Sequence, residues 1–85
     1  MAAFHVQVRV MPRATLLDPQ GQAVEHALGA LGFAGVKAVR VGRALTLTVD
    51  AATAADAHAQ ATDMCRRLLA NPVTEDFEVV VGAAP

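Results

Sequence analysis

Residues 36–49 read VKAVRVGRALTLTV, and this stretch decides which fold the chain can form. Its apolar side chains recur at alternate positions, which is the period of a β-strand with one covered face; they are Val39, Val41, Leu45, Leu47 and Val49. A straight strand of this length would span roughly 46 Å at about 3.3 Å per residue. A compact domain of 85 residues has a radius of gyration of only about 12 Å. Two alternatives therefore stay open: either Gly42 and Arg43 form a hairpin turn, or the strand bends at Gly42 and pairs with another chain.

Two shorter segments carry the same alternation on either side of this stretch. Residues 4–11 place apolar side chains on one face and mixed side chains on the other, and Pro12 then removes a backbone donor and ends the strand. Residues 75–81 place Phe77, Val79 and Val81 on one face in the same way. These segments predict an antiparallel sheet with one covered face.

Two further segments carry helix signals. Asp18 suits an N-cap and Pro19 the first helical position, so a helix is expected from Pro19 to Leu31. Its apolar face would consist of Val24, Ala27, Leu28 and Leu31. Thr53 suits the N-cap of a second, alanine-rich helix over residues 54–70. The expected sheet-facing stripe of this helix is Ala57, Ala61, Met64, Cys65 and Leu68, with Leu69 at its margin.

Together these elements predict a single domain over residues 1–85 of the α+β class. The expected architecture is a two-layer sandwich, in which an antiparallel sheet carries two helices on one face in the order β-α-β(-β)-α-β. Hydrophobic residues make up 54% of the chain, but most of them are Ala and Val, which bury little area per residue. Because such a core is thin, we expect dimerisation to extend the sheet.

Charge and cysteine content exclude several classes of protein. The net charge is −1, and no basic stripe is present that would bind nucleic acid through its phosphates. No apolar run approaches the roughly 18 residues of a membrane span. The lone Cys65 fits a reducing compartment. The expected location is therefore cytoplasmic, without nucleic-acid or membrane partners.

The sequence lacks the common catalytic and metal-binding patterns. It contains no Ser and no Gly-rich phosphate loop. His5, His26 and His58 fall on three separate elements, and one Cys is too few for a zinc cluster. We therefore expect no catalytic, cofactor-binding or metal site in this chain.

Polar residues and turn formers gather instead at the junctions between elements. Taken singly, each has an ordinary role as a cap, a turn or a solvated charge. Taken together, they form the candidate interface residues, which are Arg13, Asp18, Gln20, Gly21, Arg40, Gly42, Arg43, Asn71, Pro72 and Glu75.

Three sequence strings at these junctions carry a family resemblance. LLDPQG at 16–21, VRVGR at 39–43 and LLANPVTE at 68–75 occur in this order over nearly the whole chain. They resemble the signature blocks of the PurS family, the small subunit of bacterial and archaeal phosphoribosylformylglycinamidine synthase. Family members usually carry Lys where Arg13 and Arg43 stand here, and a forked guanidinium need not reproduce an ammonium contact.

The resemblance implies an accessory role in purine biosynthesis. The family's enzyme converts formylglycinamide ribonucleotide, ATP and glutamine into formylglycinamidine ribonucleotide. A PurL-type synthetase subunit activates the amide, and a PurQ-type glutaminase subunit releases ammonia. ATP, Mg and glutamine would then be used by these partners, with no cofactor bound by this chain. As a homodimer or homotetramer, the chain would bridge the two larger subunits through the candidate interface residues, with Arg40 and Arg43 the first choices for charged pairing across chains.

Two other functional classes stay open. A ferredoxin-like or ACT-like small-molecule sensing module has the same element order and predicts a ligand-dependent melting shift. A small enzyme that uses Cys65 or a His predicts turnover by the pure chain.

Overall fold

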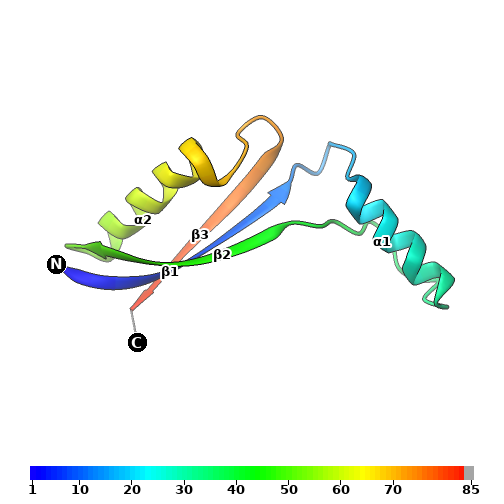
Figure 1. Ribbon diagram of the computed structural model, residues 1–85, viewed down its shortest axis with the longest axis horizontal. Coiled ribbons are helices and arrows are strands. Elements are labelled where there is room, and N and C mark those ends of the chain that lie inside the picture. The colour runs from blue at the N-terminus through cyan, green and yellow to red at the C-terminus, as the bar shows by residue number, and fades with distance from the viewer. Residues whose placement is uncertain (84–85) are drawn as a thin grey trace.

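The computed structural model describes residues 1–83 as three strands and two helices (Figure 1). The elements in chain order are β1 (Ala2–Pro12), α1 (Pro19–Ala30), β2 (Arg43–Ala51), α2 (Ala54–Met64), which continues as the π-helical turn η1 (Cys65–Leu69), and β3 (Glu75–Ala83). The α+β class is confirmed. No helix among these residues is long and apolar enough to cross a membrane.

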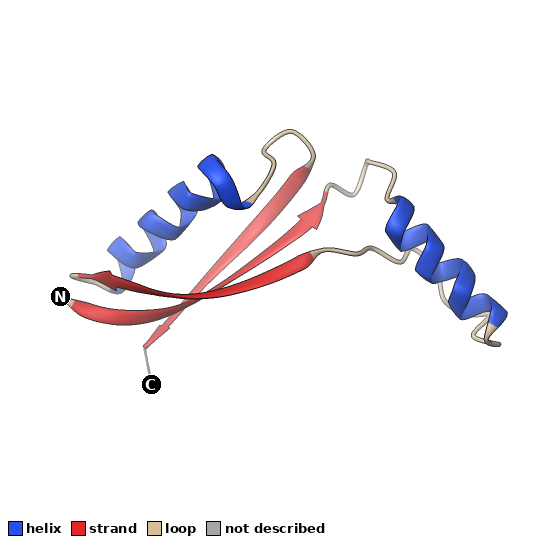
Figure 2. Cartoon of the chain, in the orientation of Figure 1, coloured by secondary structure: helices blue, strands red, loops and turns tan. Residues whose placement is uncertain are grey.

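The sheet has three antiparallel strands in the order β2-β1-β3, so the first strand of the chain lies in the centre (Figure 2). Val6 lies opposite Leu47 on one side and Val81 on the other, and Val8 lies between Leu45 and Val79. Residues opposite each other share a face. The alternating side chains of all three strands therefore combine into one apolar face.

The core lies between this face and α2. Val6, Val8 and Val10 are fully buried, and they pack in one cluster with Ala57, Ala61 and Cys65. The helix begins as expected, because Thr53 Oγ1 accepts a hydrogen bond from the Asp56 amide at 3.1 Å.

The last turn of this helix differs from the prediction at Leu68. The Ala70 amide donates to the Cys65 carbonyl at 3.0 Å, an i→i+5 bond that widens the turn by one residue. Leu69 packs on the core and Ala70 is buried, whereas Leu68 is 82% exposed. The expectation that Leu68 faces the sheet was wrong because it assumed 3.6 residues per turn to the end.

The long strand expected over residues 36–49 is interrupted. Within the described residues 1–83, residues 36–42 pair with no strand, and β2 begins at Arg43. The hairpin alternative at Gly42 and Arg43 is wrong, because the chain runs on into β2 without reversing (Figure 1). Gly42 is needed for a different reason: a side chain there would overlap the Val10 carbonyl oxygen and the Met11 sulfur.

Helix α1 does not lie on the sheet. Figures 1 and 2 show it held away from the sheet and α2, at the far end of two connecting segments. The expectation of two helices on one face is therefore corrected to one, α2. As a result the molecule measures 51 × 29 × 14 Å and has a radius of gyration of 16.4 Å, against about 12 Å for a compact domain of this size.

Candidate subunit interface

Two connecting segments join α1 to the sheet, and we call them together the neck: residues 13–18, which contain a turn, lead out to α1, and residues 36–42 lead back. Asp18, at the N-cap position of α1, is only 8% exposed. Its Oδ2 accepts a hydrogen bond from the Val41 amide at 2.8 Å. The Val41 amide is also the main cause that lowers the pKa of Asp18, followed by the amide of Gly21, although Asp18 makes no capping hydrogen bond to the helix.

Two more charged side chains cross the neck. Arg40 donates to the Leu16 carbonyl at 2.8 Å and to the Arg13 carbonyl. Glu25 of α1 accepts a hydrogen bond from the Val39 amide at 3.3 Å. The two segments of the neck are thus joined by hydrogen bonds from charged side chains to the backbone. In a β-ladder, backbone–backbone hydrogen bonds would join them instead.

Gly21 allows the first turn of α1 to lie against the returning segment. A side chain at this position would overlap the Val39 carbonyl oxygen and come within 2.7 Å of Asp18 Oδ2. The DPQG string therefore has a steric basis, because its Gly lies against the returning segment.

A second network joins the end of α2 to β3. Arg43 donates to both carboxylate oxygens of Glu75, at 2.6 and 3.1 Å, and also to the Leu69 carbonyl. Glu75 Oε1 accepts in addition from the Asn71 amide at 2.8 Å. The Arg43 guanidinium and this amide hold the pKa of Glu75 below its ordinary value.

Arg13 connects the two networks. Its guanidinium donates to the Pro72 carbonyl at 2.5 Å, and its Nε lies 3.7 Å from Asp76 Oδ1. Its backbone amide donates to the Thr74 carbonyl at 3.0 Å. The start of the neck is therefore tied to the loop before β3.

The structure thus brings most candidate interface residues into two intrachain networks. Gln20 is exposed on the first turn of α1. Arg40 and Arg43 find their partners within the same chain. Pairing of these two arginines across chains stays a prediction, as do the subunit contacts of the other candidate interface residues.

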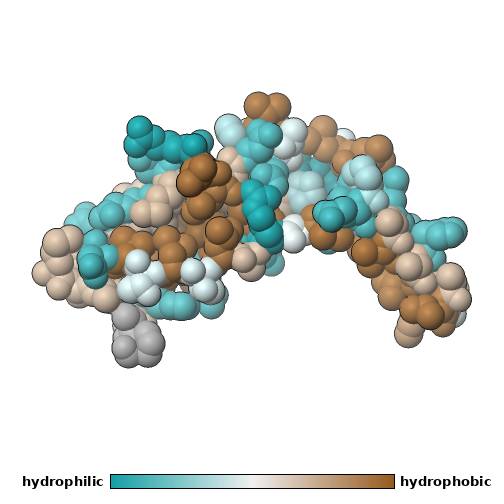
Figure 3. All heavy atoms as spheres, in the orientation of Figure 1, coloured by the Kyte–Doolittle hydropathy of each residue, from teal (hydrophilic) through white to brown (hydrophobic). Residues whose placement is uncertain are grey.

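Sequence reasoning missed the apolar surface that these networks leave uncovered. On the arm, by which we mean α1 and its tip through residue 35, Leu31 is 75% and Phe33 is 58% exposed, and Val24 is exposed as well. The face of α1 was predicted, but it was expected to pack on the chain's own sheet. Figure 3 shows this apolar surface on the arm and a second one on the sheet and α2, which together we call the body.

The second apolar surface is a groove beside α2, which we call the β2 groove. It has a volume of about 390 Å³ and is lined by Leu45, Thr46, Leu47, Asp63, Met64, Arg67, Leu68 and Leu69. Strand β2 is an edge strand here, so its outer backbone groups lie open beside the groove. The exposure of Leu68 by the π-helical turn contributes to this surface.

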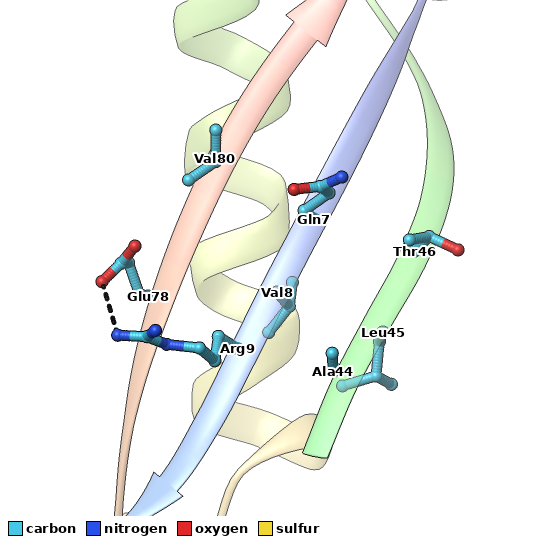
Figure 4. Close-up of a pocket in the computed structure, with 8 residues that line it drawn as sticks. All are labelled: Gln7, Val8, Arg9, Ala44, Leu45, Thr46, Glu78 and Val80. Atoms are coloured by element: carbon cyan, nitrogen blue, oxygen red, sulfur yellow. Dashed lines mark hydrogen bonds and ion pairs between the residues drawn. The ribbon is translucent and has the colours of Figure 1, made fainter. Parts of the chain in front are cut away.

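The opposite face of the sheet carries a shallow hollow of about 350 Å³, shown in Figure 4. Gln7 and Thr46 lie in it beside an exposed ion pair between Arg9 and Glu78, at 3.5 Å. Val80 is half exposed there. Such a mixed face is usual for an antiparallel sheet with one side in solvent. Among residues 1–83, no three potential ligands lie together where they could hold a metal ion.

Charged side chains that cross-link the backbone, an outstretched arm and two uncovered apolar surfaces define a class of protein: a small assembly module. The model of the PurS family, phosphoribosylformylglycinamidine (FGAM) synthase, matches residues 5–83. The chain belongs to this family.

Individual relatives agree with the family match. The chain is 41% identical to the FGAM synthase subunit PurS of Synechocystis, over 88% of this chain and 75% of that one, and 38% identical to that of Bacillus subtilis, over 92% of each. It superposes on a chain of the solved PurLQS structure of Thermotoga maritima with a TM-score of 0.88 at 32% identity, over 96% of this chain and all of that one. The protein is thus a PurS subunit of FGAM synthase, a ligase complex of purine biosynthesis, and the sensing-module alternative is set aside.

Proposed function

We propose that this chain bridges a PurQ-type glutaminase and a PurL-type synthetase, so that ammonia passes between them, and that it supplies no catalytic group. The likeness to a chain of the PurLQS structure supports a place in such a complex. The intrachain networks support a structural role, because the charged side chains at the junctions are already engaged with backbone carbonyls and amides. ATP, Mg and glutamine would be used by the partners, in the cytoplasm.

The advantage of such a bridge is kinetic. Ammonia is nucleophilic only in its neutral form and is readily lost to bulk water. Fixing the two larger subunits in one register raises its effective concentration at the synthetase.

The observation that carries the part of the proposal that concerns assembly is the amount of surface left uncovered. The chain exposes 5833 Å², whereas a compact monomer of 8.8 kDa exposes about 4,800 Å². The excess, roughly 1,000 Å², is similar to the ~800 Å² that each partner contributes to a standard protein interface. A chain of this shape therefore buries as much surface as a compact monomer of its mass only when it assembles with a partner.

A second copy of the chain is the partner that fits the two apolar surfaces best. The apolar face of the arm and the β2 groove lie on one chain but do not contact each other (Figures 1 and 3). If each arm docks in the β2 groove of the other copy, a two-fold axis relates the two contacts and the assembly closes. The sheet of each copy would then carry two helices on its apolar face, one its own and one from its partner. This arrangement gives a homodimer, and two such dimers would form the homotetramer.

Reconstitution tests the bridging role. Glutamine-dependent formation of formylglycinamidine ribonucleotide is measured with the cognate synthetase and glutaminase, with and without this chain. We expect product only in the three-part mixture, while ammonium salts support the synthetase alone. Equal glutamine-dependent rates without this chain would refute the bridge, and turnover by the pure chain would refute its non-catalytic role.

A further inference from the structure

The neck depends on side chains for its cross-links. Among residues 1–83, no backbone–backbone hydrogen bond joins segment 13–18 to segment 36–42. The bonds that close the neck involve Asp18, Glu25 and Arg40, and we call these three side chains the neck clasp. Without these cross-links the two connecting segments would bend relative to each other, because each keeps much of its backbone entropy.

Asp18 is the central member of the clasp. It is the single buried charged residue among those the structure describes. Its carboxylate bonds to the Val41 amide and lies next to the backbone of Gly21, so it contacts the helix start and the returning segment together. A buried carboxylate that accepts an amide hydrogen bond is strongly held, because leaving both groups without partners is costly.

The returning segment is held in a specific shape at this point. Ala38 has a φ of 55°, in the left-handed region that residues other than Gly rarely adopt. The next three residues, Val39, Arg40 and Val41, each bond to the outgoing segment or to α1. An unfavourable φ followed directly by three cross-links indicates that the surrounding bonds fix the backbone.

We propose that the neck clasp, centred on Asp18, fixes the direction of α1 relative to the sheet, so that Asp18 is a positioning residue for assembly. The clasp holds the arm extended before any partner arrives. Association then avoids most of the entropy cost of ordering the neck, which is the general benefit of preorganisation. The proposal rests on arm docking for its effect on association, but its effect on the arm itself is independent of docking.

The test follows the arm in a chain that cannot dock. Leu31→Glu serves as the parent, because it places a charge on the apolar face of the arm. Residual dipolar couplings and ¹⁵N relaxation of the backbone amides report whether α1 and the sheet move as one body. In the parent, both should fit one alignment, with α1 order parameters near about 0.85.

The Asp18→Ala variant of this parent should free the arm. We expect α1 couplings to shrink and its order parameters to fall towards about 0.6 or below, while the sheet keeps the parent's values. Asp18→Asn keeps an oxygen that can accept from the Val41 amide, and should restore most of the coupling. Asp50→Ala, an exposed position on β2, is the matched control and should change neither part.

Two results would overturn the proposal. Unchanged α1 couplings in Asp18→Ala would show that the clasp does not hold the arm. Loss of native couplings in the sheet as well would show that Asp18 serves the fold, not the arm.

Self-association provides a second readout in the chain with native Leu31. Asp18→Ala should dissociate about tenfold more readily, which corresponds to about 1.4 kcal/mol, measured by sedimentation equilibrium. If Asp18→Ala has the same dissociation constant as the unmodified chain, the role of Asp18 in assembly is refuted. If the unmodified chain does not self-associate, the proposed dimer is refuted. The dipolar couplings of α1 would then still test whether the neck clasp holds the arm.

Discussion

Single charged side chains hold two junctions of this molecule, the neck and the end of α2. Asp18 and Glu75 each accept backbone amides that strand pairing and helical bonding leave free, at Val41 and Asn71. Arg43 also donates hydrogen bonds to both carboxylate oxygens of Glu75. The sequence pointed to these positions as junction residues, but it could not indicate their distant partners, because Asp18 and Val41 are 23 positions apart and Arg43 and Glu75 are 32 apart.

Acid should remove part of the stability that Glu75 provides. A pKa lowered in the folded state means that the stabilisation is present above the ordinary carboxyl pKa and is lost as pH falls through the folded value. Glu75→Gln should therefore unfold at lower urea than the unmodified chain at pH 7, and the gap should narrow below about pH 4. Unfolding is followed by circular dichroism. A difference in urea midpoint between the two chains that does not change with pH would contradict this role of Glu75.

Cys65 should be inert in the folded chain. Its side chain is fully buried against the core, and burial raises the pKa of the thiol. We expect a thiol reagent such as DTNB to label it only as fast as the chain unfolds. Rapid labelling at native pH would revive the alternative of an enzyme that uses this thiol.

At the scale of elements, the periodicity of apolar residues predicted the buried face of each element that packs on another element of the same chain. The strands around Val6, Val8 and Val10 and the α2 stripe through Ala61 were predicted from spacing alone. Spacing did not predict the π-helical turn, because an i→i+5 bond leaves no mark in the residue pattern. It also could not show that the apolar face of α1 lies away from the sheet of its own chain, because the same pattern suits a partner's sheet.

A charge on the arm should weaken self-association without unfolding the body. We expect Leu31→Glu to raise the dissociation constant of the dimer at least about tenfold, because burying an unpaired carboxylate is costly. His26→Glu, also exposed on α1 but outside its apolar face, is the control and should have little effect. Sedimentation velocity separates the two, and equal association of both variants would exclude the arm as the contact.

At the scale of the whole molecule, the class of fold was predictable and the shape was not. Strand and helix signals determine which elements form, so the α+β class followed from them. The placement of α1 depends on the neck, whose cross-links run between residues such as Asp18 and Val41 that are distant in sequence. The long apolar stretch after residue 36 left a hairpin and a bent strand open as alternatives. Neither predicts the dimensions of 51 × 29 × 14 Å, which follow from the placement of α1 away from the sheet.

Stability should depend on concentration, because much of the apolar surface is covered only in an assembly. We expect the thermal midpoint to rise with chain concentration over about a hundredfold range, as mass action requires when folding and association are coupled. The Leu31→Glu variant should show a midpoint that is independent of concentration. A concentration-independent midpoint in the unmodified chain would mean that the single chain is the stable unit.

The central place of β1 has a consequence for synthesis. This strand leaves the ribosome before β2 and β3, yet it needs both of them as neighbours. Until β3 has been translated, one edge of a valine-rich strand stays open to other nascent chains. The speed of translation between β2 and β3 should therefore influence how much of the product reaches the native state, and chaperones that shield extended apolar segments should improve the yield.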